Sequence, residues 1–173
     1  EVNYRIIKSM EELSRLISEL KEAGEFALDT ETTSLNPIDA ELVGISLSYK
    51  AKEAYYVPVG HVDKEHNLDL TLVIENLKKL LEDANIKKIG HNLKYDLEVL
   101  RRLGIELRGN YFDTMVASYL LNPSFRQHNL NYLALEHLDH KMIPISDLIG
   151  TGAKQKSFDL SLIHISEPTR QAE

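Results

Sequence analysis

The chain has 173 residues, of which 43% are hydrophobic and 27% are charged, a composition typical of one folded domain and not of a disordered or fibrous chain. Its net charge of −7 excludes a surface that holds nucleic acid through bulk positive potential, and its lack of cysteine excludes disulfides, thiolate metal sites and a cysteine nucleophile. No apolar run is long enough to cross a membrane, so we expect no membrane partner and a cytoplasmic location.

The first part of the chain predicts a short strand, an amphipathic helix and a three-stranded meander. The strand is expected at residues 4–8. Ser9 and Glu12 then form a capping box before a helix that ends at Gly24. Three further segments have the composition of strands: residues 25–30, 42–49 and 54–59. The short link between the last two predicts that the three strands pair antiparallel.

Helices and short strands alternate in the remainder of the chain. The expected elements are a helix that begins after Asp69, a strand at residues 87–90, a helix at 92–103, a strand at 111–113, and helices at 114–121 and 130–138. Antiparallel strands followed by strand–helix–strand units are typical of an α/β domain with a mixed sheet. We expect one such domain, covering residues 1–159.

Two acidic residues, Asp29 and Glu31, stand at the end of the first meander strand. Residues two apart in a strand share a face, so both carboxylates point the same way where the sheet opens to solvent. Carboxylates this close repel each other unless a cation lies between them, and hard ions such as Mg²⁺ prefer oxygen ligands. The pattern alone also fits a strand that merely ends in a polar turn.

Four further residues have both a functional and a structural interpretation. Asn92 and Asp96 lie at i, i+4 spacing beside the apolar stripe of their helix; Asn92 can be an N-cap, and Asp96 can be a solvated residue at the rim of the core. Tyr95 can stack on a nucleobase or simply pack. Asp113 stands at a strand–helix junction, where capping is the favoured role and catalysis is the alternative.

Four segments together resemble the 3′–5′ exonucleases of the DEDD superfamily, most specifically the proofreading domain of bacterial family A DNA polymerases. They are DTETTSL at residues 29–35, HNLKYDLEVL at 91–100, IELRGNYFDTMVASYLLNP at 105–123 and KMIPISDLIGTGAKQKSF at 141–158. The resemblance extends over residues 4–159. It implies a ribonuclease H-like fold, which is an α/β architecture with a mixed five-stranded sheet flanked by helices.

The resemblance also implies a two-metal reaction, in which Mg²⁺ or Mn²⁺ ions hold the scissile phosphate between them. Asp29 would bridge both ions, Glu31 would bind the ion of the attacking water, and Asp96 would hold the second ion, directly or through water. The residues implied for contact with the 3′ end of single-stranded DNA are Thr32, Leu35, His91, Asn92 and Tyr95. Stacking on such side chains tolerates any base, which suits an editing enzyme.

The third motif of the family, Tyr-x-x-x-Asp on a later helix, does not occur in residues 1–173. Residues 160–170 instead read LSLIHISEPTR, residue for residue the translation of a transposase adapter used in DNA sequencing libraries. We therefore expect a gene fragment whose residues 160–173 are a non-native tail that packs poorly. A naturally divergent C-terminus is the alternative. Without the third motif we expect this chain to have little or no exonuclease activity.

Three functions remain open at this point. The first is a proofreading exonuclease domain that belongs to a longer DNA polymerase and partners its polymerase domain. The second is a non-catalytic scaffold or nucleic-acid-binding module of the same fold, which the three carboxylates argue against. The third is an RNA exonuclease of the ribonuclease D type, which the segments FDTM (112–115) and KQKSF (154–158) fit less well.

Overall fold

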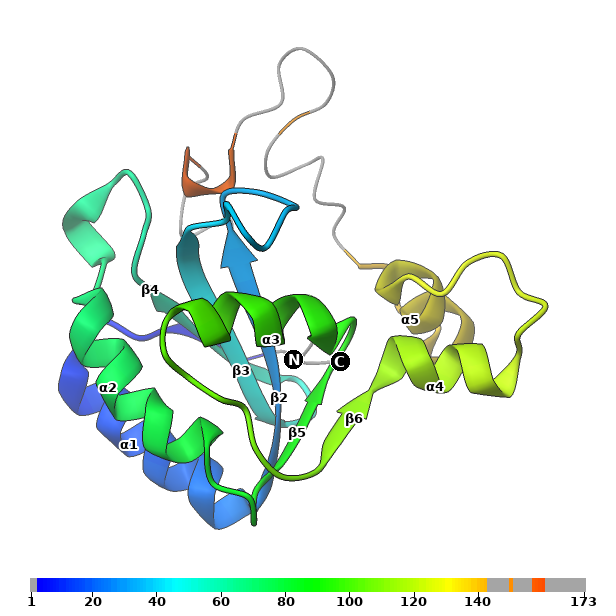
Figure 1. Cartoon of the computed structure of the whole chain (residues 1–173), viewed down its shortest axis with the longest axis horizontal. Coiled ribbons are helices and arrows are strands. Elements are labelled where there is room, and N and C mark those ends of the chain that lie inside the picture. Colours follow the sequence, from blue (N-terminus) through cyan, green and yellow to red (C-terminus); the bar gives the residue numbers. More distant parts are fainter. Residues whose placement is uncertain (1–2, 143–149, 151–156, 161–173) are drawn as a thin grey trace.

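The computed structural model describes residues 3–142, 150 and 157–160 (Figure 1). Its strands are β1 (Asn3–Ile6), β2 (Glu25–Thr32), β3 (Leu42–Lys50), β4 (Glu53–Pro58), β5 (Lys87–Gly90) and β6 (Tyr111–Asp113). Its helices are α1 (Met10–Ala23), α2 (Leu70–Leu81), α3 (Leu93–Arg102), α4 (Thr114–Leu121) and α5 (Leu130–Leu138), with short 3₁₀ helices η1 (Lys64–His66) and η3 (Phe158–Leu160). Within this part of the chain, no helix is both long and apolar enough to span a membrane.

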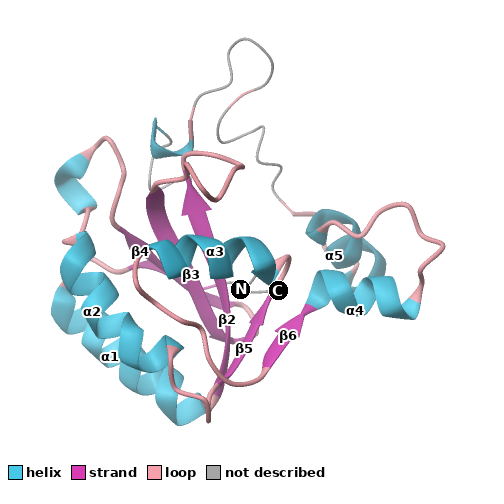
Figure 2. Cartoon of the chain, viewed as in Figure 1, coloured by secondary structure: helices cyan, strands magenta, loops and turns pink. Residues whose placement is uncertain are grey.

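The strands form one sheet in the order β1-β4-β3-β2-β5-β6 (Figure 2). Strands β2, β3 and β4 are antiparallel neighbours, which confirms the predicted meander, and β1, β5 and β6 each pair in parallel. The predicted mixed α/β architecture is confirmed, but the expected count of five strands is wrong. The additional strand of the sheet is β1, which forms where a short strand was expected at residues 4–8; its pairing with β4 joins residues about fifty positions apart, which no local sequence pattern predicts.

Helix α1 begins and ends where the sequence predicts. The Ser9 side chain accepts a hydrogen bond from the backbone N–H of Glu12 at 3.2 Å, and the Glu12 carboxylate accepts from the backbone N–H of Lys8 at 2.8 Å. Gly24 follows the helix with φ of 73°, a left-handed conformation that glycine adopts without steric cost. These local contacts are sufficient to fix the turn from α1 into β2.

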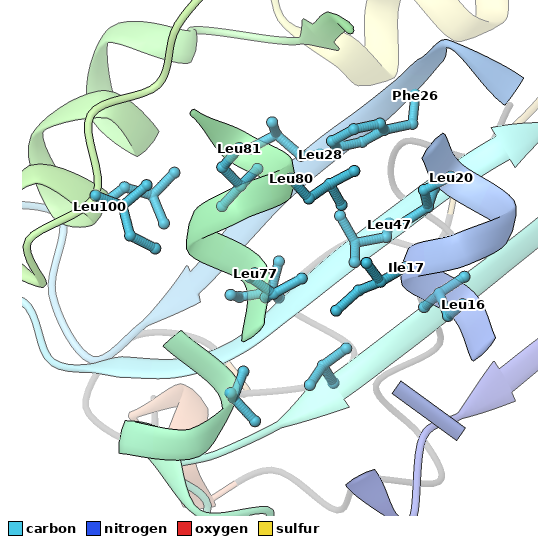
Figure 3. Close-up of a cluster of buried hydrophobic side chains, with 14 of the residues drawn as sticks. Leu16, Ile17, Leu20, Phe26, Leu28, Leu47, Leu77, Leu80, Leu81 and Leu100 are labelled. Atoms are coloured by element: carbon cyan, nitrogen blue, oxygen red, sulfur yellow. The ribbon is translucent and has the colours of Figure 1, made fainter. Parts of the chain in front are cut away.

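The apolar core lies between one face of the sheet and helices α1, α2 and α3 (Figure 3). Its helical residues include Leu16, Ile17, Leu20, Leu77, Leu80, Leu81 and Leu100. From β2, Phe26 and Leu28 point into the same core. Side chains alternate along a strand, so Ala27, Asp29 and Glu31 lie on the opposite face. This alternation directs the acidic pair away from the leucine core.

Helices α4 and α5 lie beside β6, at the edge of the sheet away from α2 (Figure 1). A cavity of about 510 Å³ is lined by these two helices together with residues of β2, β3 and β5. On α4, the side chains of Leu120 and Leu121 are 79% and 84% exposed. The two helices therefore contribute less to the core than α1, α2 and α3, and they present apolar surface to solvent.

A buried lysine joins the loops that precede β5 and β6. Lys88 has no exposed surface, and its Nζ donates hydrogen bonds to the backbone oxygens of Asp83 at 2.5 Å and Arg108 at 2.8 Å. Burial lowers the pKa of Lys88, and the charge of Asp83 opposes that change. The ammonium group thereby holds together the two loops that lead into β5 and β6.

Replacing Lys88 with methionine is expected to lower the free energy of unfolding by about 2–3 kcal/mol. Methionine has a side chain of similar length but no donor, so the backbone carbonyls of Asp83 and Arg108 lose their charged partner. Urea unfolding followed by circular dichroism measures the change. Lys87→Met is the matched control and should cost less than about 1 kcal/mol, since the partly exposed Lys87 ammonium pairs with Glu25 at 3.1 Å and lies 5.6 Å from the centre of the Phe112 ring. Equal losses in the two variants would contradict the structural role of Lys88.

Candidate active site

Asp29 and Glu31 lie at the carboxyl end of β2, on the face of the sheet opposite the leucine core. Both side chains are half-buried. In the ladder with β3, Asp29 pairs with Ser46 and Glu31 pairs with Gly44, so small residues stand opposite both carboxylates. The register shifts directly after Glu31, an irregularity that changes the strand direction beyond the acidic pair. The two carboxylates thus share one face at the end of the strand, and the paired residues on β3 have small side chains or none.

Asp96 projects from α3 and is only 2% exposed, so the alternative of a solvated residue at the rim is wrong. Its Oδ1 accepts hydrogen bonds from the backbone N–H of Thr30 at 2.8 Å and from the Thr30 hydroxyl at 2.7 Å. The carboxylate is therefore tied to the residue between Asp29 and Glu31. Thr30 was not among the residues predicted from sequence, although a polar residue that continues the inward-facing series of Phe26 and Leu28 was a usable signal.

Burial raises the pKa of Asp96 from 3.8 to about 6. The hydrogen bonds from Thr30 favour the carboxylate and oppose this rise, whereas the negative charge of Asp113 adds to it. The anion of Asp96 is thus costly to keep in the absence of a nearby positive charge. Such a carboxylate gains stability from a cation that approaches it.

Asp113, at the end of β6, accepts hydrogen bonds from four backbone amides. Its Oδ1 accepts from Asn92, Met115 and Val116, and its Oδ2 accepts from Leu93. Asp113 therefore caps α4, and it also accepts from the first amides of α3. Asn92 stands at the N-cap position of α3, as predicted, with a left-handed backbone of φ 64°, but its side chain makes no cap hydrogen bond. The Asn92 side chain is exposed, and its amide group can therefore form hydrogen bonds with groups outside α3.

A hydroxyl cluster holds the turn after β2 against α3. The Tyr95 hydroxyl lies 2.5 Å from the Thr32 hydroxyl and also donates to the backbone oxygen of Ser34. Leu35 follows this turn with its side chain 98% exposed. The structure thus brings Thr32 and Tyr95 together and presents Leu35 as an apolar side chain in solvent beside them.

His91 lies in a different environment from the other predicted site residues. Its Nδ1 is 2.8 Å from the Thr114 hydroxyl, its Nε2 is buried without a hydrogen-bond partner in the described residues, and burial lowers its pKa. His91 lines the cavity under α4 and α5. As far as the described residues go, the walls of that cavity include none of the other predicted site residues. The location of His91 therefore gives no support to direct contact with the 3′ end.

The donor chemistry of the site fits a hard divalent cation. Asp29, Glu31 and Asp96 supply only carboxylate oxygens, the ligands that Mg²⁺ and Mn²⁺ prefer. In the ranges that the structure describes, however, no three histidine, cysteine or acidic side chains lie close enough together to enclose one ion. Asp29 and Glu31 are therefore the residues that would hold a metal directly, and Asp96 would act on it at longer range.

Comparison with known proteins identifies the family to which this site is similar. A protein-family model described as 3′-5′ exonuclease, of the DNA polymerase A type, matches residues 4–161. DNA polymerase I of Pseudomonas aeruginosa is 39% identical over 172 residues, a match that covers 97% of this chain and 19% of the relative. DNA polymerase I of Borreliella burgdorferi is 39% identical over 148 residues, covering 86% of this chain and 16% of the relative. The chain thus spans about a fifth or less of these relatives' lengths.

Solved structures show the same fold. NrnC of Brucella melitensis with bound Mg²⁺ superposes with a TM-score of 0.62 at 25% identity, covering 82% of this chain and 64% of NrnC. Escherichia coli RNase D, an exoribonuclease, superposes with a TM-score of 0.64 at 22% identity, covering 82% of this chain and 35% of that protein. The latter likeness concerns the fold alone.

Proposed function

The chain belongs to the 3′-5′ exonuclease family of the DNA polymerase A type, and we propose that it acts on the 3′ end of single-stranded or frayed DNA. The observation that carries the proposal is the acidic pair Asp29 and Glu31 at the open end of β2, with Asp96 hydrogen-bonded to the peptide between them. The reaction of this family is hydrolysis of the terminal phosphodiester bond. Because the protein has a net charge of −7, a positive charge from a bound ion is needed to hold that phosphate.

We propose that divalent ions, Mg²⁺ or Mn²⁺, supply this charge at Asp29 and Glu31. When bound, such ions polarise the phosphate and lower the pKa of a water molecule. Two observations support this assignment: the site offers oxygen donors alone, and the structure of the similar nuclease NrnC holds Mg²⁺. The same positive charge would stabilise the buried anion of Asp96, which would help to hold the ion.

The nucleotide contacts are assigned to the residues around the turn after β2. The exposed side chain of Leu35 and the ring of Tyr95 offer apolar surface on which a terminal base packs. Thr32 and Asn92 supply polar groups for the 3′ end. The cavity-lining position of His91 makes it the weakest member of this set.

The remaining partner is a polymerase domain. The relatives named DNA polymerase I are about five times as long as the matched region. The apolar surface formed by Leu120 and Leu121 on α4 suits contact with further protein, because exposed neighbouring leucines are typical of an interface. We propose that this surface packs against another part of the longer polymerase.

We further propose that residues 160–173 are not part of the native domain. The family match ends at residue 161, close to the start of this segment, which supports the proposal. The alignment with the Pseudomonas relative covers 97% of the chain and so includes most of the segment. Residues 161–173 lie outside the described part of the structure, and so do Lys154 and Lys156 of the KQKSF segment.

The metal assignment predicts a stabilisation that depends on Asp29. Adding 5 mM Mn²⁺ is expected to raise the melting temperature of the wild-type chain by several degrees, because the ion binds the folded state alone. Asp29→Ala is expected to lose this shift. The exposed Glu22, in the last turn of α1, provides the control variant Glu22→Ala, which should keep the shift. The same two variants are then assayed for shortening of 5′-labelled DNA and RNA oligonucleotides. A metal shift that survives Asp29→Ala, or a preference for RNA, would argue against the proposal.

A further inference from the structure

Tyr56 of β4 and His61 of the loop after it form a buried polar pair. Their side chains are 1% and 2% exposed, and the Tyr56 hydroxyl lies 2.7 Å from His61 Nε2. The two rings meet edge to face with centroids 5.7 Å apart. Neither residue belongs to the set described above, and a buried hydrogen bond of this kind holds both side chains in place.

The sheet register brings this pair to the acidic site. Tyr56 pairs with Ser46, which in turn pairs with Asp29, so Tyr56 and Asp29 lie on one face of the sheet. The Tyr56 ring leans toward the next row of that face, because a Cβ at Gly44 would overlap its hydroxyl group. Gly44 is the residue that pairs with Glu31. The Tyr56 hydroxyl therefore occupies the position of the side chain directly opposite Glu31.

This arrangement makes Tyr56 and Glu31 close neighbours. Residues paired directly in an antiparallel ladder have Cβ atoms about 5 Å apart, and the Tyr56 hydroxyl lies 2.1 Å from the place that a Cβ of Gly44 would take. Burial raises the pKa of Tyr56, and the negative charge of Glu31 raises it further. The phenol is therefore protonated, and able to donate a hydrogen bond, at neutral pH.

His61 is in turn fixed by contacts on two sides. Its backbone N–H donates to Asn67 Oδ1 at 3.1 Å, and Asn67 Nδ2 donates to the His61 backbone oxygen at 2.7 Å. Its ring packs against Phe158 of η3 at 6.1 Å between centroids, and the backbone N–H of Val62 donates to the Asp159 oxygen at 3.0 Å. The imidazole is thus held in one orientation beside the Tyr56 hydroxyl.

We propose that Tyr56 and His61 are positioning residues for the Glu31 carboxylate. With His61 Nε2 donating to the phenol oxygen, the Tyr56 hydrogen is directed to Glu31 and fixes the orientation in which that carboxylate binds a metal ion. Gly44 is required because any side chain there would displace the phenol. This proposal rests on the metal assignment made under the proposed function.

The test is the Mn²⁺ affinity of the full 173-residue chain, measured by calorimetry and by the electron paramagnetic resonance signal of free Mn²⁺. Tyr56→Phe is expected to weaken binding about tenfold, the lower end of the effect of partners that orient metal ligands. Tyr55→Phe is the matched control, because Tyr55 lies on the other face, stacked on Tyr49 at 5.8 Å, and its loss should leave Mn²⁺ affinity unchanged. In a Glu31→Gln background, Tyr56→Phe should have no further effect.

His61 provides a second pair of variants if Tyr56→Phe unfolds. His61→Leu is expected to weaken Mn²⁺ binding, and His61→Gln, which retains a side-chain donor, to restore part of it. Wild-type affinity in Tyr56→Phe and His61→Leu would overturn the positioning role and leave the proposed function intact. Mn²⁺ binding that does not require Asp29 would overturn the proposed function, and the positioning role with it.

Discussion

Asp96→Asn is expected to stabilise the metal-free chain at pH 8 by up to about 3 kcal/mol while removing its contribution to metal binding. The wild-type carboxylate has its pKa raised from 3.8 to about 6, chiefly by burial, and a difference of this size corresponds to about 3 kcal/mol. Asparagine keeps an oxygen that can accept both hydrogen bonds from Thr30, but it carries no charge into the buried position. The gain is therefore electrostatic.

The pH dependence of this effect has a definite sign. Because the folded chain binds the Asp96 proton more tightly than the unfolded chain, wild-type stability falls as the pH rises from about 4 to about 6. The stability of the asparagine variant does not fall over this pH range, because asparagine does not ionise. The difference between the two proteins should be absent below pH 4, grow between pH 4 and 6, and be complete at pH 7 and above.

Urea unfolding at pH 4, 6 and 8 in the presence of EDTA measures the effect, with the exposed Glu22→Gln as control. Saturating Mn²⁺ should reverse the order at pH 8, because the ion stabilises the wild-type anion and not the amide. An asparagine variant that is less stable than wild type at pH 8 without metal would show that Asp96 is stabilised as an anion by the protein alone.

The elements that could be predicted from sequence are those encoded by local contacts. Helix α1 is defined by the Ser9 cap and the left-handed Gly24, and both signals lie within a few residues of the ends they mark. The alternation along β2 likewise predicts that Asp29 and Glu31 share a face. The strand at β1 was expected, but its place in the sheet was not. Its partner is β4, about fifty residues later, and a local sequence pattern does not indicate such a distant partner.

The errors at the candidate site have the same physical origin. Asn92 stands at the N-cap position, but its side chain does not accept the cap hydrogen bond. The carboxylate of Asp113, on the neighbouring strand, accepts from the backbone amides of Asn92 and Leu93 instead. Asp96 has the spacing of a residue at the rim of the core, but its carboxylate is buried because it accepts two hydrogen bonds from Thr30. Both outcomes depend on which strand lies next to which helix. The sequence therefore predicts which acidic residues are candidates, whereas their surroundings required the tertiary structure.

The largest expected change in activity follows from the third motif. A grafted chain, in which residues 160–173 are replaced by the segment that carries Tyr-x-x-x-Asp in a family relative, is expected to degrade single-stranded DNA at least about a hundredfold faster than the 173-residue chain. The reason is that the described residues gather no three metal-ligating side chains at Asp29 and Glu31. A further carboxylate at that site completes the ligand set, and loss of one such preorganised group costs about 10²–10³ in rate.

Shortening of a 5′-labelled oligonucleotide with Mg²⁺ and with Mn²⁺ measures this change. Two controls separate the motif from the added length: the graft with its motif Asp changed to Asn, and the graft with Asp29→Ala, both expected to be as slow as the ungrafted chain. DNA sequenced from the source across the codon for Asp159 tests the premise, since it should continue into this motif and not into LSLIHISEPTR. If the ungrafted chain already cleaves at the rate of the graft, Asp29, Glu31 and Asp96 suffice for catalysis. The buried Asp96 would then have to move toward the acidic pair when metal binds.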